Sequence, residues 1–399
     1  MELTDSSGLF EAQHIPSDWL LKELAEISDI DAGLSKPKII FGKGYLVVTV
    51  QDLYAGETIE SSSLKRVVLT EEEVQRYRLF DGDILIGNAS VKRSGIGYSN
   101  RFVGFEELVI FAKYAYRVKN LRFITSQYLH YALRLDKTRQ WIISNSQTGT
   151  LTNLNKAAAK SIPITFPGNI NEQKSITTAL SDLDALLDSL DRLIAKKRNL
   201  KQAAMQQLLT GQTRLPGFSG EWENKSIQEI ALVGRGRVIS HTEISKSPIP
   251  TYPVYSSQTS DDGIMGYLST YDFEGEYVTW TTDGANAGTV FARTGRFNCT
   301  NVCGTIKLNK SDHRFITAAL GRVSKSHVSR HLGNPKLMND VVKKIEIRIP
   351  KTIKEQNAIA EVLTNMDSDL AAMEQQRNKT AALKQGMMQE LLTGRTRLV

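Results

Sequence analysis

The chain has few of the residues that build disulfide frameworks, metal sites or membrane spans. Its 399 residues include only two cysteines, Cys299 and Cys303, which excludes a disulfide framework and makes a reducing compartment the expectation. The pair lacks the further Cys or His ligands of a zinc site. No uninterrupted apolar run approaches the length of a membrane span. The acidic, polar start Met1–Asp5 does not resemble a secretory signal, so we expect a cytoplasmic protein.

Motifs of common enzyme classes are also missing. The sequence has no Gly-x-x-x-x-Gly-Lys-Ser/Thr phosphate loop and no Gly-x-Ser-x-Gly nucleophile elbow. Asn334-Pro335 is followed by Lys336-Leu337 rather than by the Pro-aromatic pair of an amino-methyltransferase. Together with the internal repeat described below, the absence of these groups favours a binding protein without a bound cofactor. The formal charge of +7 gives a moderate indication of a polyanionic partner.

What the chain does contain is an internal repeat. Pro167–Leu215 aligns without a gap onto Pro350–Leu398, and 21 of the 49 aligned positions are identical. Weaker matches extend the repeat to Trp19 and Trp222, and to the start of one strand in each half. Repeats of this length indicate a repeated architecture. The chain is therefore interpreted as two half-molecules in tandem, with similar frames and divergent interiors.

The two repeated segments have the pattern of long helices. Apolar residues recur at alternating steps of four and three over Glu172–Leu209 and over its copy, Glu355–Leu392, and a glycine follows each segment. Asn171 is the expected cap of the first helix. Each apolar stripe needs a partner, and the copy is the obvious one, so we predict an antiparallel coiled coil. The alternative is two unrelated surface helices, each packed on its own domain. The predicted interface consists of Ile176, Leu180, Leu183, Leu187, Leu190, Ile359, Leu363, Met366, Leu370 and Met373.

Outside the helices, short β-rich runs alternate with Gly- and Asp-rich turns, which is typical of mixed α/β domains; strands are expected at Leu108–Val118 and Tyr252–Tyr255, among others. Short helices are expected near Ser126–Leu135 and Phe315–Ser324. The predicted class is α+β: two mixed α/β domains separated by two long antiparallel helices with pseudo-twofold symmetry. The predicted boundaries are 1–166 and 215–349 for the domains, and 167–214 and 350–399 for the helical spacers.

Polar and basic clusters in the variable regions are candidate DNA contacts. Arg and Lys suit phosphates and guanine edges, while Asn and Gln pair with adenine edges. Each cluster taken alone is better explained as a solvated turn, but the occurrence of clusters in both halves favours nucleic-acid contact. The candidates are Lys92, Arg93, Lys137, Arg139, Gln147 and Thr148 in the first half, and Tyr255, Ser256, Ser257, Asn286, Arg293 and Arg296 in the second.

The doubled motif resembles the specificity subunit of type I restriction–modification systems. The pattern is Pro-x₄-Glu-Gln-x₂-Ile-x₃-Leu-x₃-Asp, and it occurs at Pro167–Asp184 and again at Pro350–Asp367. Leu-Lys-Gln, Met-Gln and Leu-Leu-Thr-Gly follow each copy. The run Gly82-Asp83-Ile84-Leu85 adds to the resemblance. Its second-half counterpart, Glu274-Gly275-Glu276-Tyr277, departs from the family pattern.

The resemblance implies two target-recognition domains that bind the two halves of a split site in double-stranded DNA. It also implies that the chain does no bond chemistry. Two modification subunits would carry S-adenosylmethionine and methylate adenine, and a separate restriction subunit would cleave. Such a complex would act in the cytoplasm, on the nucleoid of a prokaryote. Two alternatives stay open: a stand-alone methyltransferase fused to a specificity chain, and a coiled-coil adaptor that does not contact DNA.

Overall fold

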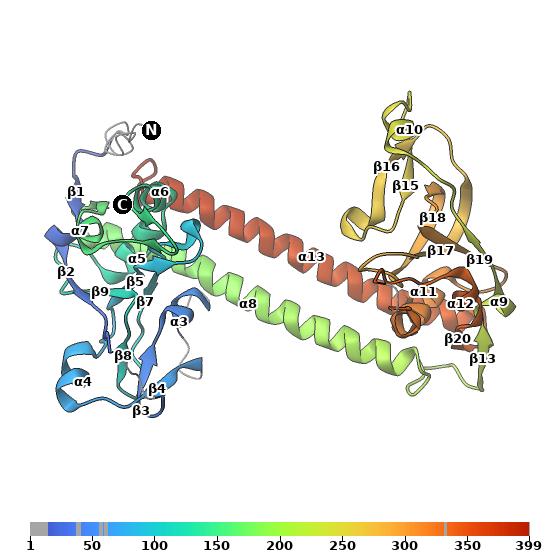
Figure 1. Cartoon of the computed structure of the whole chain (residues 1–399), viewed down its shortest axis with the longest axis horizontal. Helices are drawn as coiled ribbons and strands as arrows, with labels where there is room; N and C mark the ends of the chain where they lie inside the picture. The colour runs from blue at the N-terminus through green and yellow to red at the C-terminus, as the bar shows by residue number, and fades with distance from the viewer. Residues whose placement is uncertain (1–14, 37–40, 56–58, 60–62, 331–332, 399) are drawn as a thin grey trace. The chain divides into compact units, whose positions relative to one another are not determined.

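The computed structural model describes residues 15–36, 41–55, 59, 63–330 and 333–398. The acidic, polar N-terminal segment Met1–Asp5 lies outside the described residues. The chain divides into two compact units (Figure 1), one made of Met1–Leu190 with Gln376–Val399 and the other of Asp191–Gln375. Each unit contains one variable region and one part of each long helix. Within the described ranges, no helix is long and apolar enough to cross a membrane.

The first unit is built around a four-stranded sheet in the order β2-β9-β5-β7, with two small three-stranded sheets, β4-β3-β8 and β10-β11-β6. A two-stranded ladder, β1-β12, connects its two ends, where Trp19 pairs with Pro167. The elements are β1 (Trp19–Glu23), α2 (Leu24–Ile27), β2 (Asp29–Ala32), β3 (Phe41–Val48), α3 (Val50–Ala55), β4 (Lys65–Val67), α4 (Glu71–Tyr77), β5 (Ile84–Gly87), β6 (Ala89–Ser90), η2 (Arg93–Gly95), β7 (Ser99–Arg101), β8 (Val109–Phe111), β9 (Ala115–Lys119), α5 (Ser126–Arg134), α6 (Asp136–Ser144), β10 (Gln147–Thr148), β11 (Thr152–Asn153), α7 (Lys156–Lys160) and β12 (Pro163–Pro167).

The second unit repeats this plan in a larger sheet of six strands, in the order β14-β19-β17-β18-β15-β16. Its strands β14, β19, β17 and β18 correspond in position to β2, β9, β5 and β7 of the first unit. The ladder β13-β20 corresponds to β1-β12, with Trp222 opposite Pro350. The elements are β13 (Trp222–Ser226), α9 (Ile227–Ile230), β14 (Ala231–Arg235), α10 (His241–Ser245), β15 (Tyr252–Tyr255), η3 (Ser260–Gly263), β16 (Ile264–Leu268), β17 (Phe273–Thr281), β18 (Val290–Cys299), β19 (Cys303–Leu308), α11 (His313–Val323), η4 (Ser324–His327), α12 (Asn339–Lys344) and β20 (Glu346–Pro350).

The two long helices are α8 (Ile170–Leu208) and α13 (Ile353–Leu391), each of 39 residues. Both begin two residues before and end one residue before the predicted limits. The predicted cap at Asn171 is wrong, because the side chain of Asn169 accepts a hydrogen bond from the Asn171 backbone N–H at 2.9 Å. Gly211 and Gly394 follow the helices with φ of 70° and 74°, a conformation that favours glycine.

The helices run antiparallel in each unit. In the second unit, Lys197 near the end of α8 pairs with Asp369 in α13 at 2.8 Å, and Arg198 pairs with Glu374 at 2.5 Å. In the first unit, Asp184 in α8 forms an ion pair with Lys384 near the end of α13. Because the start of one helix meets the end of the other in both units, the antiparallel pairing predicted from the repeat is present.

The apolar stripes pack on the domains as well as on the opposite helix. Ile176 and Leu180 are fully buried in the first core, which also contains Met388, Leu391 and Leu392 from the end of α13. In the second core, the corresponding positions belong to Ile359 and Leu363, together with Leu208 and Leu209. Leu190 and Leu370 are also buried, and the half-buried members of the predicted interface are Leu183, Leu187, Met366 and Met373. The alternative of helices packed only on their own domains is therefore wrong.

The repeated Glu-Gln pair explains why each helix starts where it does. Gln173 is fully buried, and its amide donates to the Pro167 carbonyl at 2.9 Å and accepts from the Thr125 backbone N–H at 2.8 Å. Gln356 makes the same two contacts, with Pro350 at 3.1 Å and Asp312 at 3.0 Å. One glutamine in each unit thus joins a strand, a long helix and a short domain helix.

The neighbouring glutamate binds an arginine from the other repeat. Glu172, 3% exposed, accepts from Arg397 at 2.8 Å, and Arg397 also pairs with Asp18 at 2.7 Å. Glu355, 2% exposed, accepts from Arg214 at 2.7 Å. The fork of a guanidinium matches both carboxylate oxygens, so each contact fixes geometry as well as charge. The sharply repeated Thr-Arg-Leu ends are therefore the residues that close each unit.

Candidate nucleic-acid interface

In the first unit, a small sheet brings two of the predicted clusters together. Strand β6 leads directly into the loop Val91–Gly95 and pairs with β11, which in turn pairs with β10. Lys92 and Arg93 are exposed in this loop, and Gln147 and Thr148, which form β10, are exposed on the same sheet. The arrangement gathers two basic and two hydrogen-bonding side chains on one surface, a combination suited to phosphates and base edges.

An apolar hollow lies next to this surface. A cavity of about 620 Å³ is lined by Tyr54, Lys92, Gly95, Tyr114 and Leu151, among others. Tyr54 and Tyr114 are 37% and 40% exposed, and Val91, at the base of the loop, is 84% exposed. Tyr114 has a φ of 73°, which breaks the predicted strand Leu108–Val118 into β8 and β9. Aromatic and apolar side chains beside basic ones are typical of nucleic-acid surfaces.

The other two candidates of the first unit differ in position. The Arg139 guanidinium donates to the Ser94 carbonyl at 2.9 Å and so stabilises the backbone of the loop Val91–Gly95. Burial lowers the pKa of Arg139. Lys137 is half-buried, and burial and the nearby charge of Arg395 lower its pKa to about 8. Lys137 therefore lies near Arg395, just beyond the C-terminal end of α13, and not with the other candidates.

In the second unit, two loops that are distant in sequence are joined. The Asn286 side chain donates to the Thr259 hydroxyl at 2.9 Å, which connects the loop 282–288 to the loop that follows Tyr255. Asn286 is exposed, while Tyr255, Ser256 and Ser257 are half-buried. Four of the predicted contacts thus share one surface.

Arg293 lies beneath this surface. Its side chain is only 3% exposed, and its guanidinium donates to the Asp262 carboxylate at 2.5 Å and to the Asp262 carbonyl at 2.7 Å. The guanidinium also stacks 3.7 Å from the Tyr255 ring centroid. The charge of Arg293 is therefore paired with Asp262 inside the unit and is not exposed. Arg296, in contrast, is exposed and pairs with Glu274 at 2.8 Å, with its guanidinium above the Tyr271 ring.

Two basic residues next to Asn286 were missed from the sequence. Lys325 and Arg330 are exposed and line a cavity of about 360 Å³ together with Asn286 and Pro335. The only sequence signal was the alternation of serine with basic residues in Ser324–Arg330. They give the second surface exposed positive charge, whereas the guanidinium of the predicted Arg293 is paired inside the unit.

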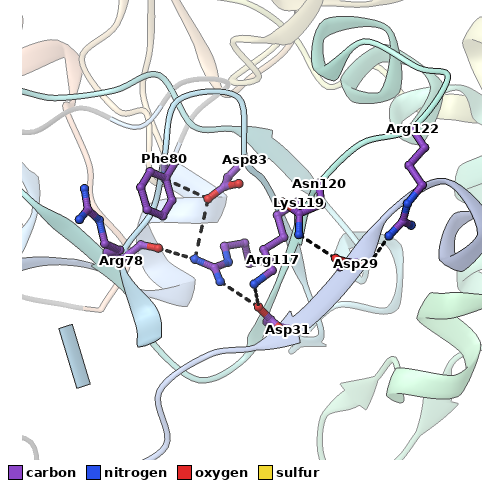
Figure 2. A network of polar contacts seen from close by, with 9 residues as sticks. All are labelled: Asp29, Asp31, Arg78, Phe80, Asp83, Arg117, Lys119, Asn120 and Arg122. Atoms are coloured by element: carbon purple, nitrogen blue, oxygen red, sulfur yellow. Dashed lines mark hydrogen bonds and ion pairs between the residues drawn. The ribbon is translucent and has the colours of Figure 1, made fainter. Parts of the chain in front are cut away.

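A buried arginine explains the Gly-Asp-Ile-Leu signature of the first unit (Figure 2). Arg117 in β9 is 3% exposed, and its guanidinium binds the Arg78 carbonyl and the Asp31 carboxylate, the latter at 2.8 Å. The Asp83 carboxylate lies 4.0 Å from Arg117 and accepts from the Phe80 backbone N–H at 2.9 Å. Burial raises the pKa of Asp83. The network forms one wall of a polar cavity of about 810 Å³.

The second unit keeps the glycine of this turn but not the network. Gly275, inside β17, has a φ of 108°, and Gly82, in the turn before β5, has a φ of 86°, so both positions favour glycine. Glu276 pairs instead with the His313 ring at 3.2 Å. Strand β17, which contains Gly275 and Glu276, pairs with both β18 and β19. The departure from the family pattern therefore leaves the strand intact.

The cysteines form neither a disulfide nor part of a metal cluster in the described residues. Cys299 and Cys303 are buried free thiols whose sulfurs lie 3.5 Å apart. No group of three or more His, Cys, Asp or Glu side chains that could hold a metal occurs in the part of the chain that the structure describes.

Comparison with known proteins assigns the chain to a family. The family model for the type I restriction modification DNA specificity domain matches residues 16–197 and again 219–382. The type I restriction enzyme MpnII specificity subunit of Mycoplasma pneumoniae is 35% identical over 152 residues, 38% of this chain and 45% of that protein. The chain therefore belongs to the type I restriction–modification DNA specificity family.

Solved structures agree with this fold. The S subunit of the type I restriction–modification system of M. genitalium matches with a TM-score of 0.64, over 94% of this chain and 96% of that chain, at 16% identity. A chain from a structural study of complex assembly and conformational transition of the type I system matches with a TM-score of 0.58 at 12% identity, over 95% and 98% of the two chains. At these identities, the likeness concerns the fold.

Proposed function

We propose that this chain selects the DNA site of a type I restriction–modification complex by binding a two-part sequence, one part through each unit. The observation that carries the proposal is the duplicated frame with two different polar surfaces. The first surface presents Lys92, Arg93, Gln147 and Thr148, and the second presents Asn286, Lys325 and Arg330. Two unlike surfaces on one frame suit two unlike half-sites.

The proposal includes partners for the chemistry. Two modification subunits would bind S-adenosylmethionine and methylate adenine, and a restriction subunit would cleave DNA. The repeated helices offer two similar docking segments, which supports a pair of modification subunits. This chain would bind DNA and position the partners without forming or breaking bonds. A fused methyltransferase is not favoured, because the repeat and the two domains account for the whole described chain.

Selection from random DNA tests the proposal. The full chain, co-expressed with its modification subunit, is incubated with duplexes that have a randomised core, and the bound duplexes are sequenced. The expected result is a consensus of two short blocks separated by unspecified base pairs. Lys92→Gln together with Arg93→Gln should lower the slope of log K against log salt by about two without changing the consensus.

Other outcomes would overturn it. A single continuous consensus would contradict the two-part site, and no enrichment at low salt would favour an adaptor without DNA contact. Lys343→Gln with Lys344→Gln, on α12, which packs on α9 and β14 and lines neither candidate cavity, is the matched control. It removes the same charge and should leave the salt slope unchanged.

A further inference from the structure

Two arginines that were expected to contact DNA support recognition loops instead. Arg139 in α6 donates to the carbonyl of Ser94, and Arg293 in β18 donates to the carbonyl and carboxylate of Asp262. Each arginine comes from a regular element, and each acceptor lies in a loop of the candidate interface. The same device thus occurs once in each unit, on unrelated loops.

The loop of the second unit needs such a support. Asp261, Asp262 and Gly263 all have positive φ, of 49°, 50° and 80°. Two consecutive non-glycine residues in this region are strained, and such strain persists only where the surroundings hold the backbone. Arg293 binds the middle residue through two atoms, and a further hydrogen bond from its Nε to the Thr279 hydroxyl at 3.3 Å fixes the guanidinium.

The charge balance of the loop also depends on Arg293. Asp262 is 64% exposed in its side chain, beside the surface that carries Asn286 and Lys325. An unpaired carboxylate there would repel phosphates, and the paired guanidinium cancels it. In the first unit, Ser94 belongs to the same short helical turn as the exposed Arg93, and Lys92 directly precedes that turn, so a hydrogen bond to the Ser94 carbonyl restrains the backbone that carries both basic side chains.

We propose that Arg139 and Arg293 are positioning residues for DNA recognition, each holding the backbone of one loop, Val91–Gly95 or Ser256–Gly263, without contacting DNA itself. This inference rests on the proposed function. Loss of either arginine should change which bases are preferred, whereas loss of a phosphate contact should weaken binding to all sequences. The two roles are therefore separable by experiment.

The test compares Arg139→Met and Arg293→Met with the wild-type chain in the random-duplex selection and in salt titrations. Arg293→Met should reduce discrimination about tenfold in one block of the consensus and leave the other block intact. Arg139→Met should do the reverse. Arg139→Met should keep the wild-type salt slope, and so should Arg293→Met combined with Asp262→Asn, which removes the guanidinium and the carboxylate together. The controls are Arg93→Met and Arg296→Met, which remove exposed arginines, and Arg93→Met should lower the slope by about one.

A second set of variants keeps the inference testable if Arg293→Met fails to fold. Asp262→Asn removes the exposed partner and should reproduce the change of Arg293→Met, and the double variant should be no worse than either single one. Arg293→Lys keeps the charge but not the fork and should restore discrimination only in part. Circular dichroism at the assay temperature monitors folding throughout.

The outcomes separate this inference from the proposed function. If the wild-type chain yields no two-part consensus, the proposed function fails. If the wild type yields one and Arg293→Met lowers the salt slope by about one with both blocks unchanged, Arg293 contacts phosphate and this inference is wrong. Additive effects of Asp262→Asn and Arg293→Met would also contradict it.

Discussion

Helices α5 and α11 occupy the same place in the two units but carry different side chains. Their N-caps, Thr125 and Asp312, bind the equivalent Gln173 and Gln356, which fixes the alignment. Three large side chains of the first helix correspond to small ones in the second. The aligned pairs are His130 with Thr317, Tyr131 with Ala318, and Arg134 with Gly321.

The difference leaves a space in the second unit. In the first, the buried Tyr131 hydroxyl donates to Asp184 in α8 at 2.7 Å. In the second, Thr317, Ala318 and Gly321 line a cavity of about 680 Å³, together with Asp367, the counterpart of Asp184. Meanwhile Glu172 and Glu355 keep the same arginine contacts. The arginine contacts that join the two repeats are thus retained, while the side chains of the domain helix that face the long helices have diverged.

The sharpest way to break this comparison is to remove the filling side chain. Tyr131→Ala should destabilise the first unit by about 4 kcal/mol, because it leaves a cavity and removes the hydrogen bond that Asp184 accepts from the Tyr131 hydroxyl. Ala318→Tyr should stabilise the second by about 1 kcal/mol, because it fills existing space. Hydrogen exchange measured in each unit separately would report both changes. If Ala318→Tyr does not stabilise the second unit, the cavity there is not equivalent to the Tyr131 site.

The shared contacts should respond alike in the two units. Arg397→Ala and Arg214→Ala each leave a buried glutamate unpaired and should cost about 2–3 kcal/mol, less than a fully buried pair because each arginine is partly exposed. Urea unfolding of the full chain measures the loss. Arg395→Ala, which removes an exposed partner of Glu390, is the control and should change stability by less than about 0.5 kcal/mol. A loss confined to one unit would argue against equivalent joints.

A smaller effect distinguishes the units by pH. Burial, with the charge of Arg134 nearby, lowers the pKa of His130 to about 3, well below its ordinary value of 6.5. The unfolded state therefore binds a proton that the folded state does not. Stability of the first unit should fall by up to about 1.4 kcal/mol per pH unit as the pH drops from 6.5 towards 3.

His130→Gln should flatten this dependence, whereas Thr317 in the second unit contributes none. The measurement is the urea midpoint of the first unit at pH 7 and pH 5, followed by hydrogen exchange. A pH dependence that is unchanged in His130→Gln would assign the effect to other groups.

The sequence predicted the frame better than the surfaces. The periodic stripes located α8 and α13 to within two residues, because 39 residues of regular spacing leave little ambiguity. Tyr252–Tyr255 was predicted with the observed limits. The break at Tyr114 was not predicted, since a positive φ in tyrosine has no sequence signal.

Contacts between distant segments explain the remaining errors. Nothing in the sequence near Arg293 indicates that Asp262 lies against it, so the arginine looked like a surface residue. Lys325 and Arg330 became candidates only when the fold placed them beside Asn286. Charge type could be predicted from composition, but whether a charge points outward depends on pairings that span many residues.

The contact between Arg397 and Glu172 joins the C-terminal end of the second repeat to the start of α8, and this has a consequence for biosynthesis. Trp19, Ile176 and Leu180 belong to a core that also needs Met388 and Leu391, yet about 185 residues separate the two parts of this unit in the chain. At typical ribosome speeds, that interval lasts roughly 10–40 s. During it, the nascent first unit would expose apolar surface, so chaperone dependence and aggregation of prematurely terminated products should be concentrated there.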